Sequence, residues 1–386
     1  MLVDYDLEQV KRTLTKESLT RRVSTMWRYA ELLPVEKEEN IVSLGEGWTP
    51  LIRLPRAERR YPVKRVWVKR EEQNPTGSFK ARGFSAAVSV AREYGIRKVA
   101  VNSNGNAASA LAAYAARAGM EAYVFVPKDC PRLIVEECVQ YGARTCLVDG
   151  YIHDAGKVIQ DGEAEQRWHH VGTLKEPGRA EGKKTMGLEL AEQFNWKLPS
   201  VIIYPTGGGS GIIGMWNAFR QLKALGLVEG DLPRFVSVQE SGCQPIVDAI
   251  RSGGPFAPQA EPVLCAPTGM RVPNPPDGEL IVSILRETGG TAVAVTGEEI
   301  RLAWTAFGRH GISSSPEGAA AWAGFNRLLE EGWLRPDDEV VLFNTSHAMK
   351  YMAWDVSGSG LPTVKTYQDW TRLLCKPEQE ETHFQG

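Results

Sequence analysis

The chain has 386 residues, of which 42% are hydrophobic and 24% charged, and its formal net charge is −2. This length allows a large buried core, and the near-neutral charge gives no electrostatic reason to expect nucleic acid or an anionic membrane surface as a partner. No apolar run approaches the roughly 20 residues that a membrane-spanning helix needs. The N-terminal segment carries early acidic residues and lacks the pattern of a signal peptide, so we expect a cytoplasmic protein.

The six cysteines show no spacing that indicates a metal site. No two of them form a Cys-x-x-Cys pair, and no cysteine lies in a cluster with histidines. We therefore predict free thiols in a reducing compartment and no bound metal. The cysteines are Cys130, Cys138, Cys146, Cys243, Cys265 and Cys375.

In chain order, short β-branched runs alternate with helical patterns through most of the sequence. Buried parallel strands are continuous apolar runs, and alternation with helices favours right-handed βαβ crossovers, so the sequence predicts an α/β fold. The expected strands are residues 66–69, 99–102, 122–126, 145–148, 201–204, 235–238 and 340–343. The expected helices are residues 107–117, 133–141, 184–194, 212–224, 298–309 and 317–331.

The least regular stretch is residues 253–276, which contain seven prolines. A loop of this length in a compact protein is usually functional or disordered, and we expect a lid or a subunit contact.

The first segment that indicates chemistry is Asn-Pro-Thr-Gly-Ser-Phe-Lys at residues 74–80. Its turn signals precede a helix that we expect to begin at Ala81, which leaves Lys80 at a loop-to-helix junction. A lysine there can be partly desolvated, which lowers its pKa and makes the neutral amine available to form an imine. A solvated lysine in the first helical turn is the alternative, and the motif alone does not decide between them.

The second segment lies between the expected strand 99–102 and the next helix. It consists of Ser103, Asn104, Gly105 and Asn106. Exposed N–H groups at a helix N-terminus attract anions, so a substrate carboxylate would suit this segment. Ordinary N-capping by Ser or Asn is an equal alternative.

The third segment, residues 207–211, follows an expected strand and leads into the helix that we expect from Ile212. Its glycines permit close backbone approach and the helix dipole favours negative charge, which indicates a phosphate site. The members of this segment are Gly207, Gly208, Gly209, Ser210 and Gly211.

A dinucleotide-binding alternative remains open for the same loop. Gly209, Gly211 and Gly214 form a literal GxGxxG pattern, and Glu240 follows the next expected strand.

The fourth segment is Asn-Thr-Ser-His at residues 344–347, directly after the expected strand 340–343. Polar residues at the carboxyl end of such a strand face the ligand crevice in open α/β sheets. A capped turn is the alternative.

Together these segments resemble, in the same order, the motifs of fold-type II pyridoxal-phosphate enzymes. The matching segments are NPTGSFKARG, SNGNAASALAAYAARAG, PTGGGSGIIGMWNAF, SSPEGAAA and NTSHAMK. Within that group the chain is most similar to the threonine synthases, and LGEGWTPL and PGRAEGKKT add to the match. The resemblance covers roughly residues 40 to 352.

The resemblance implies a two-domain, tryptophan synthase β-like architecture with mostly parallel twisted sheets. Residues 1–82 and 171–386 would form a large cofactor-binding domain. Residues 83–170 would form a small mobile domain that binds the substrate carboxylate, and the active site between the domains would close on the substrate. A homodimer is also expected.

The resemblance further implies the residues that would hold the cofactor, pyridoxal 5′-phosphate. Lys80 would carry it as a Schiff base, and Phe79 would pack beside it. Asn106 would hydrogen-bond its 3′ oxygen, and residues 207–211 would hold its phosphate. Thr345 would face its pyridine nitrogen.

The substrate would be a small amino acid, bound at two further places. Ser103, Asn104 and Gly105 would receive its carboxylate. Arg179 would grip its phosphate through charge-assisted bonds. A surface ion pair of Arg179 with Glu176 or Glu181 is the alternative.

The reaction that the resemblance implies is conversion of O-phosphohomoserine and water to threonine and phosphate, with Lys80 moving protons among the substrate carbons. Three positions depart from the threonine synthase pattern, which often has asparagine at Glu176 and Gly208 and threonine or serine at Asn104. Other reactions on this scaffold therefore stay open: a β-replacement synthase of the cysteate or cysteine type, acting on O-phosphoserine or a similar substrate, or a threonine or serine deaminase.

Two alternatives outside pyridoxal-phosphate catalysis are more distant. An NAD-dependent oxidoreductase would use the GxGxxG pattern but leaves residues 74–80 unexplained. A catalytically silent relative retained as a binding subunit would not be expected to keep Lys80.

Overall fold

The structure is a computed structural model that describes residues 2–173, 175–259, 267–352 and 363–374. Met1–Tyr351 form one compact unit, and Met352–Gly386 form a second unit whose described part contains helix α14 (Tyr367–Leu374). Within the described ranges, no helix is both long and apolar enough to cross a membrane.

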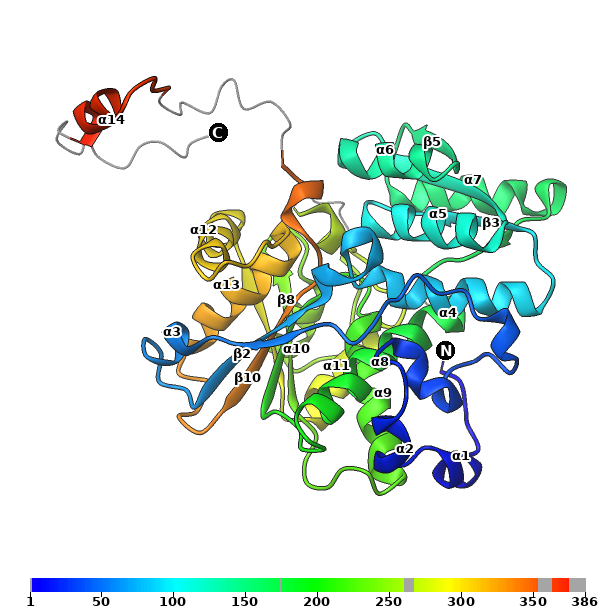
Figure 1. Ribbon diagram of the computed structural model, residues 1–386, viewed down its shortest axis with the longest axis horizontal. Coiled ribbons are helices and arrows are strands. Elements are labelled where there is room, and N and C mark those ends of the chain that lie inside the picture. Colours follow the sequence, from blue (N-terminus) through cyan, green and yellow to red (C-terminus); the bar gives the residue numbers. More distant parts are fainter. Residues whose placement is uncertain (1, 174, 260–266, 353–362, 375–386) are drawn as a thin grey trace. The chain divides into compact units, whose positions relative to one another are not determined.

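The larger unit contains two sheets, and both are mainly or wholly parallel (Figure 1). The six-stranded sheet has the order β1-β2-β10-β7-β8-β9, and only the β1–β2 pair is antiparallel. The four-stranded sheet has the order β5-β4-β3-β6 and is parallel throughout. The predicted α/β fold is therefore confirmed.

Each predicted strand lies inside an observed one. The observed strands are β1 (Leu51–Arg53), β2 (Arg65–Arg70), β3 (Lys98–Asn102), β4 (Glu121–Pro127), β5 (Arg144–Val148), β6 (His169–His170), β7 (Val201–Pro205), β8 (Arg234–Glu240), β9 (Thr291–Val295) and β10 (Glu339–Asn344). The sequence missed β1, β6 and β9, which are all edge strands, and the first two are too short to give an apolar run.

The predicted helices are present, with ends that agree within two residues except at one position. The main helices are α4 (Lys80–Glu93), α5 (Asn106–Ala118), α6 (Arg132–Gln140), α7 (Ile152–Gln166), α8 (Pro177–Gln193), α9 (Ser210–Ala224), α10 (Pro245–Ser252), α11 (Gly278–Glu287), α12 (Gly297–Gly308) and α13 (Pro316–Glu330). Shorter helices are α1 (Leu7–Thr13), α2 (Lys16–Thr20) and α3 (Pro55–Glu58), and the 3-10 helices are η1 (Met26–Leu32), η2 (Glu38–Asn40), η3 (Glu71–Gln73), η4 (Pro75–Gly77), η5 (Thr268–Met270) and η6 (Ala348–Lys350).

The exception is α8, which begins at Pro177 rather than at the predicted residue 184. Glu176 is its N-cap, since its carboxylate accepts hydrogen bonds from the backbone N–H groups of Gly178 and Arg179, both at 3.0 Å. Proline at the first helical position supports this start, because its missing N–H would have no partner there anyway. The helix therefore gains an N-terminal segment that carries Arg179 and Lys183.

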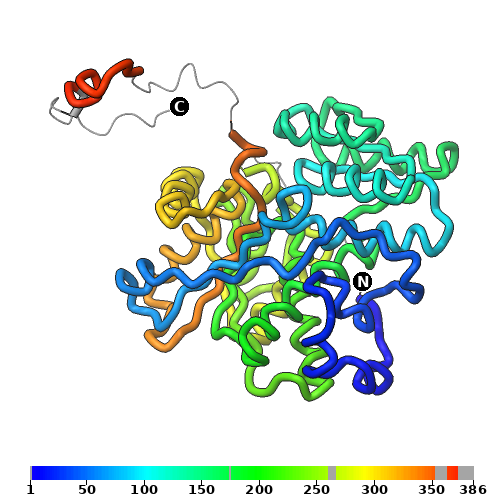
Figure 2. The backbone as a smooth tube through the Cα atoms, in the orientation of Figure 1, coloured from blue at the N-terminus to red at the C-terminus, as the bar shows by residue number. Residues whose placement is uncertain are grey.

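The central strands of the larger sheet bury both faces. Ile202 and Phe343 pack on the side of α9, while Ile203 and Val340 pack on the side of α13. Burying such a side chain stabilises the fold by about 1.5–3 kcal/mol. Figure 2 shows that β10, from near the end of the larger unit, lies beside β2, from its beginning, so that this core joins distant parts of the chain.

Four of the six cysteines, Cys130, Cys138, Cys146 and Cys243, lie among the described residues. Cys130 and Cys138 are buried free thiols and Cys146 is an exposed one. Cys265 and Cys375 lie outside the described residues.

A buried ion network fixes the start of α4. Arg82 donates to the Glu71 carboxylate at 2.7 and 2.8 Å and to the Glu189 carboxylate at 2.5 and 2.8 Å. Lys69 donates to Glu189 at 2.9 Å. All four side chains are fully buried and their charges balance, so β2, η3, α4 and α8 are held together by one neutral cluster.

Because of this network, the stability of the fold depends on pH. Burial opposes ionisation of Glu189, but the charges of Arg82 and Lys69 outweigh burial and lower the pKa of Glu189 to about 2. A carboxyl whose pKa is lower in the folded state stabilises the protein above its unfolded pKa, and this stabilisation is lost as the pH falls towards 2.

We therefore predict that Glu189→Gln lowers the urea midpoint of unfolding at pH 7 and weakens the loss of stability between pH 5 and pH 3. The measurement is urea unfolding at several pH values in that window. Glu298→Gln, which removes an exposed carboxylate, is the control and should behave as the unsubstituted chain does. Equal acid dependence in all three proteins would contradict the assignment.

Candidate active site

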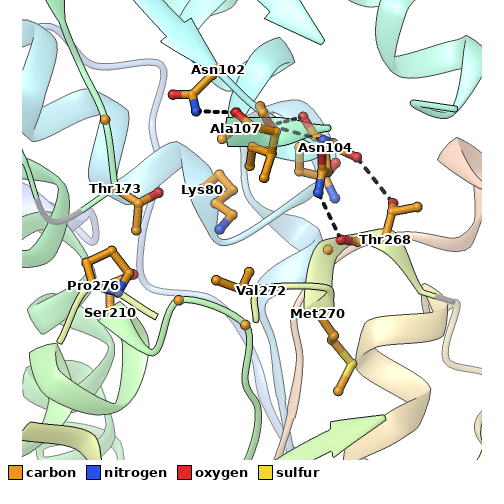
Figure 3. Close-up of a pocket in the computed structure, with 18 of the residues that line it drawn as sticks. Lys80, Asn102, Asn104, Ala107, Thr173, Ser210, Thr268, Met270, Val272 and Pro276 are labelled. Atoms are coloured by element: carbon orange, nitrogen blue, oxygen red, sulfur yellow. Dashed lines mark hydrogen bonds between the residues drawn. The ribbon is translucent and has the colours of Figure 1, made fainter. Parts of the chain in front are cut away.

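A cavity of about 650 Å³ lies within the larger unit, at the carboxyl ends of β3, β7 and β10 (Figure 3). This is the end of a parallel sheet where α/β proteins bind ligands. Of the site residues expected from the sequence, all but Arg179 line the cavity. They are Phe79, Lys80, Ser103, Asn104, Gly105, Asn106, Gly207, Gly208, Gly209, Ser210, Gly211 and Thr345.

Lys80 is the first residue of α4, and its partly buried side chain extends into the cavity (Figure 3). Burial and, to a smaller extent, the charge of Arg179 lower the pKa of Lys80 to about 7, although Glu317 opposes the shift. Near pH 7 a large fraction of this side chain is therefore the neutral amine. A neutral amine is the nucleophile that condenses with a carbonyl group.

The loop before Lys80 is held by the segment that follows β10. The N–H of Phe79 donates to the Thr345 carbonyl at 3.0 Å, and the N–H of His347 donates to the Gly77 carbonyl at 3.0 Å. Thr76, with φ +63°, adopts the left-handed conformation that such a tight turn requires. The first and fourth predicted segments thus form one structure, and Thr345 is placed beside the amine by its backbone.

The segment before α5 is free to bind a ligand at its helix terminus. Gly105 is the N-cap of α5 and makes no side-chain cap, so the expected alternative of ordinary capping is wrong. Ser103 accepts from the Gly105 N–H at 3.0 Å, which shapes the turn. The Asn106 amide donates to the Tyr351 hydroxyl at 2.8 Å, and its Oδ1 is buried with no partner among the described residues.

The glycine loop has no room for side chains. Gly209 has φ +73°, and a Cβ there would lie 2.0 Å from Ile281 Cδ1. A Cβ at Gly211 would lie 2.3 Å from the Tyr204 hydroxyl. Because α9 begins at Ser210 with no side-chain cap, its first N–H groups face the cavity and favour an anion.

The dinucleotide alternative for this loop finds no support in the geometry. The third glycine, Gly214, packs against α8, where a Cβ would lie 2.9 Å from the backbone nitrogen of Lys184. Glu240 does not line the cavity, and its carboxylate accepts from the N–H of Gly242 at 2.8 Å instead.

Arg179 lies behind the cavity wall rather than in it. It is 1% exposed, its Nη1 donates to the Val171 carbonyl at 3.0 Å, and its guanidinium lies 4.4 Å from the centre of the Phe84 ring. Burial lowers the pKa of Arg179 to about 10. Its Nε and Nη2 have no partner within the described ranges, so the surface ion pair considered from the sequence is wrong.

Glu176, where the threonine synthase pattern often has asparagine, has a structural role. Its carboxylate is used by the N-terminus of α8, as described above, and does not line the cavity. The repulsion that a carboxylate would exert on a substrate phosphate in the cavity is therefore reduced. At Gly208 a Cβ would lie 3.2 Å from Thr173 Cγ2, so a larger residue there would require Thr173 to move.

Sequence reasoning missed several groups around the cavity. Glu317 lines it, accepts from the Gly269 N–H at 3.2 Å and has a pKa raised by burial. Lys183 is buried behind it, and Tyr351 lines it beside Asn106. All three lie in or next to motifs that the sequence had singled out, so a signal for them existed. Residues of α7 also line the cavity, and that helix was not predicted.

The proline-rich stretch contributes to the site at its far end. Thr268, Met270, Val272 and Pro276 line the cavity and are labelled in Figure 3. Asn274 lines the cavity too. Thr268 Oγ1 donates to the Asn104 carbonyl at 3.2 Å. Residues 260–266 of this stretch lie outside the described residues.

Comparison with known proteins identifies the class of enzyme. The chain belongs to the family described as pyridoxal-phosphate-dependent enzyme, whose model matches residues 42–346. It is 36% identical over 349 residues to a threonine synthase of Methanocaldococcus jannaschii, covering 90% of this chain and 85% of that protein. It is 37% identical over 351 residues to a threonine synthase of Methanosarcina acetivorans, with the same coverage. The chain is therefore a pyridoxal-phosphate-dependent lyase similar to threonine synthases.

Its fold is shared with a solved structure. Threonine deaminase isoform 2 of Solanum lycopersicum superposes with a TM-score of 0.66 at 20% identity, over 80% of each chain. This agreement confirms the fold-type II architecture. The NAD-dependent alternative is wrong, because the matched family uses pyridoxal phosphate.

The residues around the cavity fit this cofactor. The glycine loop and the start of α9 suit its phosphate, and Lys80 supplies an amine with a lowered pKa. The amide oxygen of Asn106 has no partner among the described residues and is available to a polar group of the cofactor. When bound, pyridoxal phosphate supplies a ring that withdraws electrons and so stabilises negative charge on substrate carbons.

We predict that borohydride reduction of the yellow holoenzyme fixes a pyridoxyl label on Lys80 and on no other lysine. Peptide mapping after reduction is the measurement. Lys80→Ala should keep the fold, as judged by circular dichroism, but lose the label and all turnover. Lys64→Ala, which removes an exposed lysine, should retain both. A label on another residue in the unsubstituted chain would overturn the role of Lys80.

Proposed function

We propose that this enzyme converts O-phosphohomoserine and water to threonine and inorganic phosphate. The observation that carries the proposal is similarity to threonine synthases over 90% of the chain, together with a cavity whose wall and immediate surroundings are rich in cationic groups. A phosphorylated amino acid is a fitting substrate for such a cavity, because it carries two anionic ends.

In this proposal Lys80 is the catalytic acid and base. Its Nζ takes a proton from one substrate carbon and returns a proton to another during loss of phosphate and addition of water. A group with a pKa of about 7 suits both tasks at neutral pH, since it is present in both protonation states.

We assign the substrate carboxylate to the start of α5, where Ser103, Asn104 and Gly105 present the helix terminus to the cavity. Buried Asn104 supports this role, because its Oδ1 has no partner among the described residues and its Nδ2 makes only a long contact of 3.5 Å to the Thr268 carbonyl. Phe79 and Thr345 also line the cavity, where Phe79 would pack beside the cofactor ring and Thr345 would face its nitrogen.

We assign the substrate phosphate to Arg179. Two of its nitrogens lack partners, and its charge is close enough to lower the pKa of Lys80. The one hydrogen bond that its guanidinium makes among the described residues is to Val171, directly after the proposed small domain of residues 83–170. Movement of that domain relative to residues 1–82 and 171–386 would act on Val171 and turn the guanidinium towards the cavity. We further propose a cytoplasmic homodimer.

The test of the reaction is a comparison of substrates with the purified holoenzyme. We predict stoichiometric release of phosphate and threonine from O-phosphohomoserine, measured by a phosphate assay and by amino-acid analysis. Turnover of O-phosphoserine with sulfite or sulfide would instead indicate a β-replacement synthase. Release of ammonia and a 2-oxo acid from threonine or serine, without phosphate release from O-phosphohomoserine, would indicate a deaminase.

We predict that Arg179→Gln lowers kcat/KM for O-phosphohomoserine about 10- to 100-fold, the value of losing a charge-assisted hydrogen bond. Cofactor absorbance should be retained. Arg234→Gln removes an arginine paired with Asp338 at the opposite end of the sheet and should leave kcat/KM unchanged. An unchanged kcat/KM in Arg179→Gln would remove Arg179 from the substrate site.

A further inference from the structure

Lys183 is a fully buried lysine that reaches the glycine loop from behind. It lies in α8, and its Cε is 3.3 Å from the position of a Cβ built on Gly83, so the glycine in α4 leaves room for it. Its Nζ donates to Ser210 Oγ at 2.8 Å. Ser210 is the first residue of α9 and lines the cavity.

The charge of Lys183 has no counter-ion within hydrogen-bond distance. Among the described residues no carboxylate lies within 4.0 Å of its Nζ, and its neighbours Arg179 and Lys80 are also basic. The one acidic group that acts on it, Glu176, is already bonded to the N-terminus of α8. Burial and these two positive neighbours lower the pKa of Lys183 well below its ordinary value. A buried cation without a counter-ion is costly, and an anion bound at the glycine loop would offset this cost.

The hydrogen bond to Ser210 also directs the serine hydroxyl. A hydroxyl has one proton to donate, and Ser210 uses its oxygen to accept from Lys183. Within the described part of the chain Ser210 makes no side-chain donation, so its proton is available to an acceptor at the start of α9. The backbone N–H groups there favour the same kind of ligand.

We propose that Lys183 is a positioning residue for the phosphate of the bound cofactor, acting through Ser210. Its ammonium offsets the phosphate charge from behind the loop, and Ser210 donates its proton to a phosphate oxygen. The cofactor's phosphate is favoured over that of the substrate, because the one hydrogen bond that the Lys183 side chain makes among the described residues goes to the first residue of α9, in the glycine loop.

The experiment measures cofactor binding rather than turnover. Apoenzyme is titrated with pyridoxal phosphate and, separately, with pyridoxal, which lacks the phosphate. Lys183→Met should raise the Kd for pyridoxal phosphate about 10- to 100-fold, the loss expected for a charge-assisted interaction, and change the Kd for pyridoxal less than about twofold. Lys183→Gln, which keeps an amide donor for Ser210, should give a smaller loss.

Two further measurements, phosphorus NMR and thermal unfolding, distinguish a role in positioning the phosphate from a purely structural role of Lys183. The phosphate resonance of the bound cofactor should stay that of the dianion down to pH 5 in the unsubstituted enzyme and should titrate in Lys183→Met. The apoenzyme of Lys183→Met should unfold at the same temperature as the unsubstituted apoenzyme or higher, because a buried unpaired cation is removed.

Lys184→Met is the matched control on the same helix. Lys184 is also buried, but it pairs with Glu181 and lies 4.0 Å from the centre of the Tyr5 ring, away from the glycine loop. Its loss should lower stability and leave the Kd for pyridoxal phosphate unchanged.

Three outcomes would overturn the proposal. They are an unchanged Kd for pyridoxal phosphate, an equal loss for pyridoxal phosphate and pyridoxal, and a rise in KM for O-phosphohomoserine with cofactor binding intact. The last would assign Lys183 to the phosphate of the substrate. The measurements of cofactor binding use no amino-acid substrate, so their outcome does not depend on whether the proposed reaction is correct.

Discussion

The two bidentate contacts of Arg82 are the constraint on which the rest of the site depends. Arg82 follows Lys80 by two residues, and its guanidinium joins Glu71, after β2, to Glu189, on α8. A planar guanidinium holds two carboxylates in fixed directions, which a lysine could not do. The first turn of α4 is thereby set against both the larger sheet and α8. The position of the Lys80 amine is a consequence of this cluster and of the backbone bonds to the end of β10.

The same helix, α8, carries two opposite electrostatic situations. Towards its C-terminus Glu189 is matched by Arg82 and Lys69, and that cluster is neutral. Towards its N-terminus the side chains of Arg179 and Lys183 are buried, and neither side chain is bonded to a carboxylate among the described residues. The neutral cluster supports the fold, and the positive end lies next to the cavity. Stability and anion binding are thus assigned to different turns of one helix.

Much of this arrangement could be predicted from the sequence, because its motifs are local. The junctions at residues 80, 103–106, 207–211 and 345 were recognised, since the first has turn signals before a helix and the others join an apolar run to small polar residues. The cavity brings them together. What could not be predicted depends on contacts between distant segments. The direction of the Arg179 side chain, the capping role of Glu176 and the bond from Lys183 to Ser210 are set by how α8 packs on α4 and α9. Helix α7 was missed because most of its residues are polar or charged and its apolar pattern is weak.

The buried basic side chains near the N-terminus of α8 affect how the enzyme binds its cofactor. In the apoenzyme the cost of holding Lys183 and Arg179 away from water opposes folding, and part of that cost is relieved when Lys183 is neutral. An incoming phosphate removes the cost by supplying the missing negative charge, so the gain appears as binding energy. A carboxylate built into the wall would stabilise the apoenzyme more, but it would occupy the place of the phosphate and repel it. Glu176 is consistent with this argument, because its carboxylate is held at the N-terminus of α8 and does not line the cavity.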